Sequence, residues 1–374
     1  MIYFDNAATG GFKPSAVTST AETVLKYLSA NPGRSGHRLS IAGAEIVYNC
    51  RISVAKMFNS VPERVIFTKN CTEALNTAIF GTLKKGGHVI TTVFEHNSVL
   101  RPLNALKNFG FIKLDIVCPD DGKDIVKAIA EKITPDTYLI AVTAVSNVTG
   151  ETFPLHRIGK LARENNIKLL VDGAQGGGHI PIDLKADNIS MLALAGHKGL
   201  YGIMGSGALL FDENTDISPL TYGGTGMDSF NPVQPDVYPE KLEAGTLNLP
   251  AIAALNEGVN FISKNITNFN EQMIAVTEKL ISALKELNGI TVYSKTNPSG
   301  IVSFLTKHTD STEVADILNK KYDIAVRGGF HCAPLMHKYL GTENSGLVRV
   351  SLAIQNSSSE LSYFIRALKE ICKG

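Results

Sequence analysis

Short apolar runs alternate with helical patterns between about residues 60 and 212, and this alternation is the feature that most restricts the fold. Five short apolar runs predict buried strands. They are VIFT (65–68), HVITTV (88–93), YLIAVTAV (138–145), KLLVD (168–172) and GALLF (207–211). Helical spacing of apolar residues occurs between them, at 73–85, 97–108, 123–133 and 156–166. Strands and helices in alternation predict a mostly parallel sheet covered by helices on both faces.

The pattern changes after about residue 255, where helical stretches surround a few short strands. The helical stretches cover 271–287, 311–322 and 358–371, and the strands include 301–306 and 347–353. We therefore predict a large α/β domain over residues 14–255 and a smaller α+β C-terminal domain over residues 256–374. We expect the N-terminal segment, residues 1–13, to join the small domain or to line the cleft.

Composition excludes several classes of protein. Apolar residues make up 44% and charged residues 19%, with a formal net charge of +1, which is typical of a globular protein and does not favour nucleic acid as a partner. No apolar run reaches the ~18–20 residues that span a bilayer. The N-terminal MIYFDNAATGG lacks the pattern of a signal peptide, so we expect a cytoplasmic protein. The five cysteines are scattered without CxxC spacing, which argues against disulfides and against a metal site.

Polar side chains follow three of the predicted strands. Asp172 ends KLLVD, His96 follows HVITTV, and Asn147 follows YLIAVTAV. Ligands of open α/β sheets bind beyond the carboxyl ends of the strands, so these side chains are candidates for a binding site. An Asp after a strand is also a common helix N-cap. The glycines at 176–178 favour instead a turn with close backbone approach.

Lys198 follows an apolar run in a Gly-rich turn, next to His197. The simplest interpretation of such a lysine is a solvated loop residue. A desolvated lysine, however, has a lowered pKa and forms a Schiff base with an aldehyde. An Asp that faces a pyridine nitrogen keeps that ring protonated, and such a lysine with its Asp partner is typical of enzymes that use pyridoxal 5'-phosphate (PLP). Lys198 and Asp172 are our candidates for these two positions.

A phosphate-binding turn is predicted where a strand meets a helix in KNCTEALN. Asn70, Cys71 and Thr72 lie at the expected helix N-terminus, where backbone N–H groups and a hydroxyl bind phosphate well. The alternative is that Thr72 and Glu73 only begin the helix.

Eight motifs spread over the chain resemble those of the cysteine desulfurases, which are class V aminotransferase-like, fold-type I PLP enzymes. They are FDNAAT (4–9), CTEALN (71–76), EHNS (95–98), SNVTGE (146–151), VDGAQ (171–175), GHK (196–198), EAGT (243–246) and RGGFHCAP (327–334). They occur in family order over nearly the whole chain, and the RxGxHC loop resembles the SufS-like group II. The resemblance implies PLP as cofactor, L-cysteine as substrate, a sulfur-acceptor protein or thiol, and a homodimer.

The resemblance also implies a role for each matching position. Lys198 would carry the Schiff base and act as acid and base, with His96 stacked on the ring. Asp172 would pair with the pyridine nitrogen and Gln175 with the phenolic oxygen. The phosphate ligands would be Thr72, Cys71, His197 and, from the neighbouring subunit, Thr246. Asn147 and Arg349 would hold the substrate carboxylate, which the planar fork of arginine suits.

Cys332 decides which reaction the resemblance implies. An isolated cysteine is by default a small buried hydrophobe. Cys332 lies instead in the polar loop Arg-Gly-Gly-Phe-His-Cys, where we expect Arg327 and His331 to favour the nucleophilic thiolate. As a nucleophile, Cys332 would take sulfur from the substrate as a persulfide and leave L-alanine.

Two departures from the family pattern leave the substrate and the sulfur acceptor open. Ala195 stands where many relatives have a Ser or Thr that binds the phosphate, and Phe330 replaces a second His next to the nucleophile. A selenocysteine lyase, another β-eliminating lyase and a class V aminotransferase are the alternatives within PLP chemistry. A non-catalytic scaffold is disfavoured because Lys198 and Asp172 are both present. A nucleotide-binding dehydrogenase would need a G-x-G-x-x-G after the first strand, which the sequence lacks.

Overall fold

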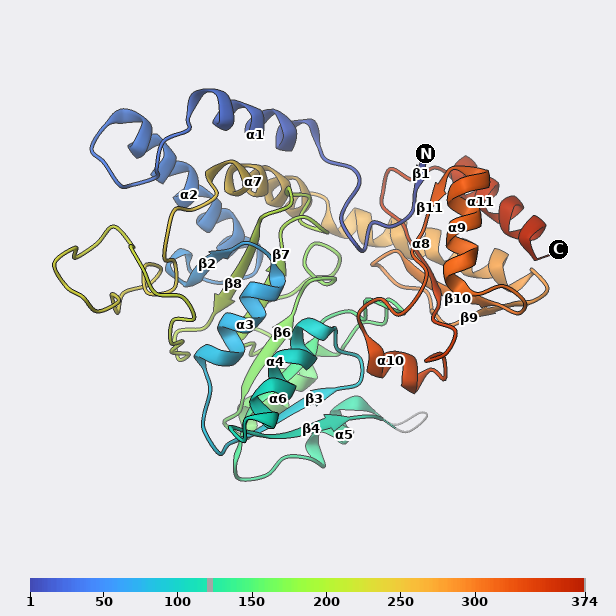
Figure 1. Ribbon diagram of the computed structural model, residues 1–374, viewed down its shortest axis with the longest axis horizontal. Helices are drawn as coiled ribbons and strands as arrows, with labels where there is room; N and C mark the ends of the chain where they lie inside the picture. Colours follow the sequence, from blue (N-terminus) through green and yellow to red (C-terminus); the bar gives the residue numbers. More distant parts are fainter. Residues whose placement is uncertain (120–123, 373–374) are drawn as a thin grey trace.

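The described residues, 1–119 and 124–372 of the computed structural model, form two lobes (Figure 1). The large lobe is built on a seven-stranded sheet, and the small lobe on a three-stranded sheet with a two-stranded ribbon beside it. The predicted fold class, an α/β protein with a mostly parallel sheet and a smaller α+β part, is confirmed. The large sheet contains β2 (Val65–Thr68), β3 (His88–Thr92), β4 (Lys113–Val117), β5 (Thr137–Thr143), β6 (Lys168–Asp172), β7 (Met191–Ala195) and β8 (Gly207–Phe211).

The large sheet has the strand order β2-β8-β7-β6-β5-β3-β4. Neighbouring strands are parallel from β7 to β4, and β8 alone runs antiparallel to both of its neighbours. All five predicted strands occur, and β4 and β7 complete the sheet. Because β3, β5, β6 and β7 are parallel, their carboxyl ends lie at one edge of the sheet.

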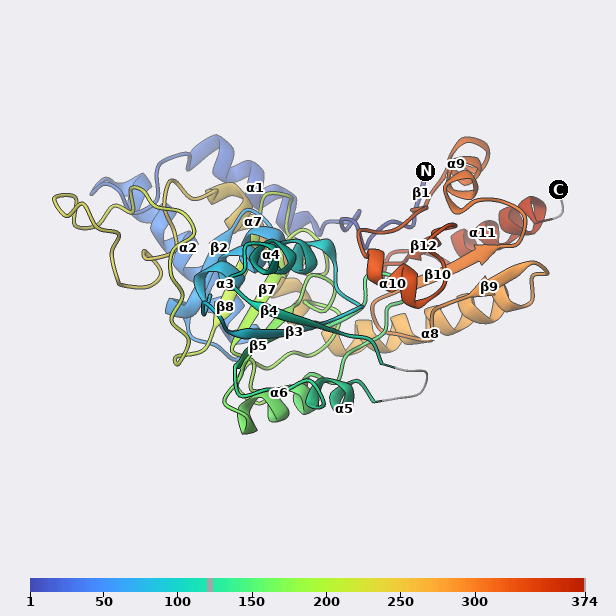
Figure 2. The ribbon, with the colours of Figure 1, turned by 60° about the horizontal axis from the view of Figure 1, so that its bottom comes forward.

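Helices cover both faces of the large sheet, as Figure 2 shows. The helices of this lobe are α1 (Ser15–Tyr27), α2 (Arg38–Met57), the 3-10 turn η1 (Pro62–Arg64), α3 (Cys71–Gly81), α4 (Asn97–Asn108), α5 (Ile125–Ala130), α6 (Leu155–Glu164) and α7 (Leu249–Ser263). Alternate residues of one strand pack on opposite faces: Leu170 of β6 packs with α3 and α4, whereas Leu169 and Val171 pack with α2, α6 and α7. The helix predicted at 123–133 is shorter, and its first residue, Lys123, lies outside the described residues.

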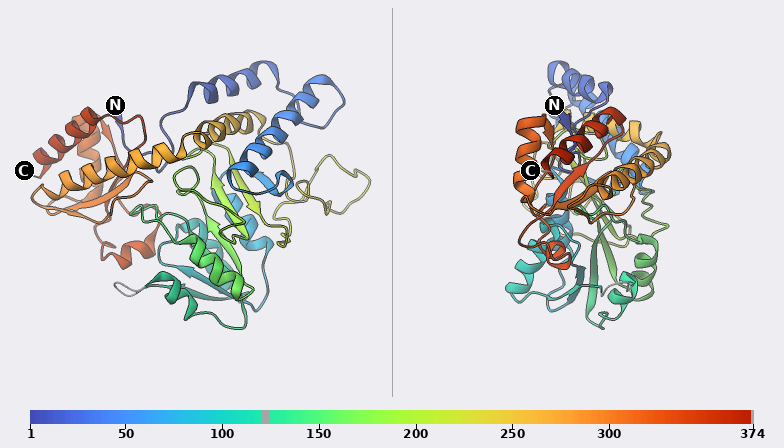
Figure 3. Two further views of the ribbon diagram at one scale, coloured as in Figure 1. Left: turned by 180° about the vertical axis from the view of Figure 1, so that it is seen from behind. Right: turned by 90° about the vertical axis from the view of Figure 1, so that its right-hand side faces the viewer.

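The small lobe encloses its own apolar core, in which Phe4, Phe304 and Phe364 are fully buried. Its strands are β9 (Ile290–Val292), β10 (Ile301–Thr306) and β12 (Val348–Ser351), with β1 (Ile2–Tyr3) and β11 (Ile324–Ala325) as the ribbon. Its helices are α8 (Ile266–Lys285), α9 (Ser311–Tyr322), α10 (Pro334–Tyr339) and α11 (Ser358–Ile371). Seen from behind, α8 runs out of the large lobe along the small one (Figure 3).

The N-terminal segment belongs in part to the small lobe, because β1 pairs in parallel with β11. The predicted division between residues 255 and 256 falls inside α7, and it stays a prediction. Among residues 1–119 and 124–372, no helix is both long and apolar enough to cross a bilayer.

Candidate active site

A pocket at the carboxyl edge of the large sheet brings together most of the site residues that the sequence singled out. Eight of the eleven candidates line it: Cys71, Thr72, His96, Asn147, Asp172, Gln175, His197 and Lys198. Cys332, Arg349 and Thr246 lie outside this lining. The eight converge because β3, β5, β6 and β7 all point their carboxyl ends at this edge, and the turn before α3 reaches the same place.

Asp172 is buried at the last position of β6. Its Oδ1 accepts the backbone N–H of Ala174 at 2.9 Å and the thiol of Cys71 at 3.5 Å. Burial, and then the negative charge of Asp172, raise the pKa of Cys71 well above its usual value, so Cys71 stays a neutral thiol. Burial lowers the pKa of Lys198, and Asp172 only partly opposes this. A lysine with a lowered pKa is the reactive amine that Schiff-base chemistry needs.

The turn into α3 provides the donors of a phosphate site. The Asn70 side chain caps the helix by accepting the N–H of Glu73 at 2.9 Å. The first N–H groups of a helix have no partner within it, so those of Cys71 and Thr72 are suited to an anion. The Thr72 hydroxyl lies 2.8 Å from the hydroxyl of Ser98, at the start of α4. This donor set, with Lys198 and Asp172 behind it, fits a group that carries a phosphate, an aldehyde and a ring nitrogen.

His96 lies at the N-cap of α4 with its ring over the pocket lining. Its Nδ1 accepts the N–H of Ser98 at 3.1 Å and lies 2.9 Å from the Ser98 hydroxyl. Burial lowers the pKa of His96, so the ring is neutral and its proton is on Nε2. Ser98 therefore fixes both His96 and Thr72, a role that the EHNS motif contained but that we had not assigned.

Gln175 and His197 are both tied to the N-terminal segment. Gln175 is buried and donates from Nε2 to the carbonyl of Ala7 at 2.8 Å. The amide nitrogen has a second N–H for another acceptor. His197 Nδ1 lies 3.0 Å from the hydroxyl of Thr9, and burial lowers the pKa of His197 to about 4. His197 is therefore a neutral hydrogen-bonding group.

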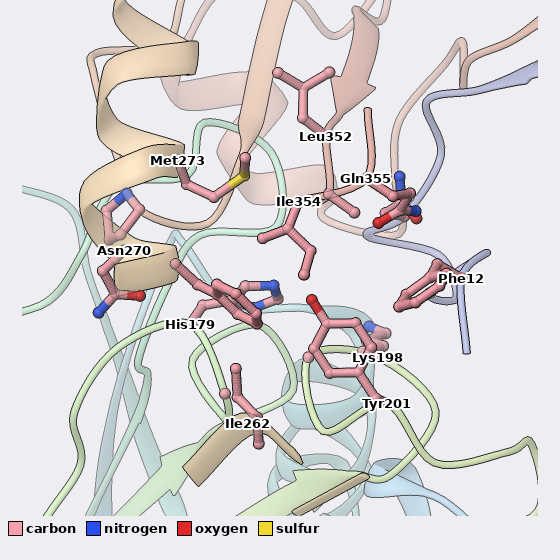
Figure 4. Close-up of a pocket in the computed structure, with 17 residues that line it drawn as sticks. Phe12, His179, Lys198, Tyr201, Ile262, Asn270, Met273, Leu352, Ile354 and Gln355 are labelled. Atoms are coloured by element: carbon pink, nitrogen blue, oxygen red, sulfur yellow. The ribbon is translucent and has the colours of Figure 1, made fainter. Parts of the chain in front are cut away.

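A second, more apolar hollow lies on the other side of Lys198, between the two lobes. Figure 4 shows Tyr201, Ile354 and Phe12 pointing into it from the lysine turn, from the loop after β12 and from the N-terminal segment. The turn itself is tightly packed. Gly178 has a φ of +86°, and a Cβ on it would lie 2.1 Å from the carbonyl oxygen of Gly199, which confirms the close backbone approach expected there.

Cys332 is exposed on a strained turn of the small lobe that docks against the large lobe. His331 and Cys332 have consecutive φ values of 50° and 58°, which cost about 1–2 kcal/mol each for residues other than glycine. Two contacts from the large lobe hold the turn. Asn147 Nδ2 donates to the carbonyl of His331, and the backbone N–H of Asn97 donates to the carbonyl of Cys332, both at 2.7 Å. The nucleophile candidate is thus fixed from the pocket edge, by residues after β5 and β3.

His331 does not favour the Cys332 thiolate through a positive charge of its own. His331 is buried. Burial, followed by the charge of Arg349, lowers the pKa of His331 to about 2, so the ring is uncharged. Arg327 is the cation at the thiol, with Nη2 3.8 Å from Cys332 Sγ.

Arg349 lies in β12 and is 1% exposed. Its Nη1 donates to the carbonyl of Asn147 and its Nη2 to Asp5 Oδ1, both at 2.9 Å. Asn147 thus connects the Cys332 turn to Arg349: its side chain contacts the turn, and its backbone carbonyl contacts Arg349. Asp5 is a site residue that we had missed, although it lies in the FDNAAT motif.

Thr246 is not part of the pocket lining of its own chain and lies on an exposed loop. This loop follows β8 and stands off the large lobe on the side away from the small lobe, in yellow in Figure 1. The nearby Glu243 is anchored by a paired contact with Arg51 of α2. The Thr246 hydroxyl accepts a long hydrogen bond of 3.4 Å from Asn31 of its own chain, and its predicted role stays a prediction.

Comparison with known families identifies a match along nearly the full chain. The family model described as "Aminotransferase class-V" matches residues 2–364.

Individual relatives match over similar lengths. A probable cysteine desulfurase of Pyrococcus abyssi is 34% identical, over 100% of this chain and 95% of the relative. The apo structure of a cysteine desulfurase from Thermococcus onnurineus superposes with a TM-score of 0.91 at 32% identity, over 100% of this chain and 95% of that one. A cysteine desulfurase of Escherichia coli, in an S-sulfonic acid form, superposes with a TM-score of 0.90 at 26% identity, over 99% and 94% of the two chains.

Proposed function

The chain belongs to the aminotransferase class-V family, and from this premise we propose that it is a PLP-dependent cysteine desulfurase. It would convert L-cysteine to L-alanine and keep the sulfur as a persulfide on Cys332. The observation that carries the proposal is the docking of the Cys332 turn, through Asn147 and Asn97, at the edge of the Lys198 pocket. An aminotransferase needs no thiol at this place, whereas a desulfurase does.

The residues of the pocket fit PLP as the cofactor. Lys198 would hold its aldehyde, Asp172 its ring nitrogen, Gln175 its phenolic oxygen, and Cys71, Thr72 and His197 its phosphate. When bound, PLP supplies an electron sink that stabilises negative charge at the substrate α-carbon. The neutral His96 ring would cover it. Ala195 also lines the pocket and offers no hydroxyl, so within this chain the phosphate of PLP would be held by Thr72, His197 and the helix N-terminus.

The chain's own residues would move the protons and the sulfur. Lys198, once released by the substrate amine, would accept the α-proton, because its lowered pKa favours the neutral amine. The Cys332 thiolate would attack the substrate sulfur. An S–S bond forms, the substrate C–S bond breaks, and its electron pair is left on the substrate β-carbon, which is protonated to give alanine. The outer sulfur of the persulfide then passes to an acceptor thiol, and Cys332 is returned as a thiol. No external oxidant is needed.

Arg349 and Asn147 would hold the substrate carboxylate, and Thr246 would complete the phosphate site of the partner in a homodimer. The exposed loop that carries Thr246 supports this, because the loop is held at Glu243 and extends away from its own pocket.

Substitution Cys332→Ala tests the proposal. We expect the purified variant to keep the yellow absorbance of bound PLP and to lose at least about 1,000-fold of its alanine and sulfide production from L-cysteine. Cys118→Ala removes the other exposed cysteine and is the matched control, with activity expected to be unchanged. Full activity of Cys332→Ala would contradict the role of Cys332. Parallel assays with L-selenocysteine and with keto acids distinguish a selenocysteine lyase and an aminotransferase.

A further inference from the structure

Arg349 is covered by the protein itself in a way that leaves no room for a substrate. Its guanidinium contacts the carboxylate of Asp5 on one side and the carbonyl of Asn147 on the other, and only 1% of the side chain is exposed. Its Nε is buried, and no residue in the described part of the chain accepts a hydrogen bond from it. An arginine that binds a substrate carboxylate must first be uncovered.

The contact between Arg349 and Asp5 is incomplete. A carboxylate that fully engages an arginine accepts two parallel N–H bonds, whereas a single 2.9 Å contact joins Nη2 to Asp5 Oδ1. Asp5 is about one-fifth exposed, so water competes for its carboxylate. A ligand that satisfied both Nη2 and Nε would bind this guanidinium better than Asp5 does.

Asp5 also lies between the two lobes. Next to it, the N–H of Ala7 donates to the Ser351 hydroxyl of β12 at 2.9 Å, and Asn6 Nδ2 donates to the Ser351 carbonyl. Farther along, the N–H of Gly10 and the amine of Lys13 each donate to the carbonyl of His197 at 3.0 Å. Figure 4 shows this segment at the side of the hollow next to Lys198, with Phe12 pointing into the hollow. A shift of Asp5 would therefore change the contacts of the N-terminal segment with both lobes.

Charge decides what happens when a substrate arrives. Two carboxylates on one buried guanidinium would repel each other at short range. With Asp5 withdrawn, Arg349 and the nearby Arg327 leave a net positive charge even beside a Cys332 thiolate, and this charge attracts one carboxylate.

We propose that Asp5 is a stand-in anion, which neutralises Arg349 in the free enzyme and is displaced by the α-carboxylate of the substrate. This role rests on the proposed function, because it takes Arg349 as the substrate carboxylate site. Asp5 is then a specificity-determining residue: it weakens binding of every carboxylate ligand by the same competition and leaves ligands without a carboxylate unaffected.

The test is a spectroscopic titration of the PLP-loaded enzyme. L-alanine carries the carboxylate without a thiol, and L-alaninol is the matched amine without the carboxylate. Asp5→Asn keeps the shape of the side chain and removes its charge. We expect its Kd for L-alanine to be about tenfold lower than that of the wild type, and its Kd for L-alaninol to be unchanged. Asp323→Asn, which removes the carboxylate that contacts the N-terminal amine at 2.6 Å, should change neither constant.

A second measurement uses only the wild type. Hydrogen exchange of the backbone amides of residues 2–9 should become faster when L-alanine saturates the enzyme, because Asp5 leaves Arg349. L-alaninol should not produce this effect. This measurement decides the question even if Asp5→Asn fails to fold or to retain PLP.

The outcomes separate the two proposals. The role of Asp5 is overturned if Asp5→Asn has an unchanged or higher Kd for L-alanine, or if hydrogen exchange of residues 2–9 is unchanged or slower with L-alanine. In either case, turnover of L-cysteine by the wild type leaves the proposed function intact. No turnover and no spectral response of the wild type to either ligand overturns both.

Discussion

Two buried arginines, one in each lobe, are paired with carboxylates in different ways. Arg51 of α2 forms a fork with Glu243: Nη1 contacts Oε1 at 2.9 Å and Nη2 contacts Oε2. Glu243 also accepts the N–H of Phe67, and the guanidinium lies over the Phe67 ring at 4.7 Å. Arg349 of β12 has one contact with Asp5, and its Nε has none.

The difference separates a structural pair from an exchangeable one. A buried arginine and a buried carboxylate are tolerated when each satisfies the other, and the Arg51 pair meets this condition on both sides. In the Arg349 pair, the Nε donor of Arg349 is not used by Asp5, and the Asp5 carboxylate is partly exposed. The first pair anchors the loop that carries Thr246, and the second is suited to a change of anion. Removing one partner from each pair should therefore affect different properties.

The largest expected effect is on stability, from Arg51→Met. It leaves the buried Glu243 without its cation, and we expect the free energy of unfolding to fall by about 3–5 kcal/mol. Urea unfolding of the purified protein measures this change. The double variant Arg51→Met/Glu243→Leu should recover most of the loss, because it removes both charges. A loss below about 1 kcal/mol would show that the pair is not a structural anchor.

Lys26→Ala is the matched control for Arg51→Met. It removes the cation of an exposed pair with Glu22, four residues away in α1. Such a pair contributes about 0.3–0.5 kcal/mol.

The next effect is on catalysis, from Arg349→Lys. Lysine keeps the charge but lacks the planar fork, so it cannot hold a carboxylate by two bonds. We expect kcat/KM for L-cysteine to fall about 100-fold, which corresponds to about 2.7 kcal/mol, with the PLP absorbance retained. Steady-state kinetics of alanine release measures the change. An unchanged kcat/KM would place the substrate carboxylate elsewhere.

The smallest expected effect concerns Glu95, a buried carboxyl that lacks an arginine partner. Its Oε1 accepts the hydroxyl of Thr92, and its Oε2 makes no hydrogen bond. Burial raises the pKa of Glu95 to about 8 from the usual 4.5. A bound proton therefore neutralises Glu95, whereas arginines neutralise Glu243 and Asp5. The negative charge of Asp172 acts in the same direction.

Glu95→Gln tests this assignment through the pH dependence of stability. Between about pH 4.5 and 8 the folded chain keeps a proton that the unfolded chain has lost, so the stability from this proton is present at low pH and is lost as pH rises. Glutamine does not titrate. The stability of the wild type relative to Glu95→Gln should therefore fall by about 1 kcal/mol or more from pH 5 to pH 8. A difference that is constant with pH would show that Glu95 is ionised.

Much of the large lobe was predictable from the sequence, because its signals are local. Strand periodicity, the polar residues at strand ends and the Gly-rich turn that carries Lys198 each occupy a few consecutive residues. The parallel sheet then brings the ends of its strands together by geometry. This is why Asp172, Lys198, His96 and Thr72 could be placed in one pocket before their distances were known.

The sequence by itself thus determined the sheet, the pocket at its edge and the candidate lysine, aspartate and cysteine. Only the tertiary structure decided which groups are charged and which are covered. His331 lies four residues after Arg327 in the same loop and is yet neutral, because burial lowers its pKa. Asp5 meets Arg349 across 344 positions of sequence, and Asn147 reaches His331 across 184. Contacts of this kind depend on how the lobes pack, and no local pattern of residue types encodes them.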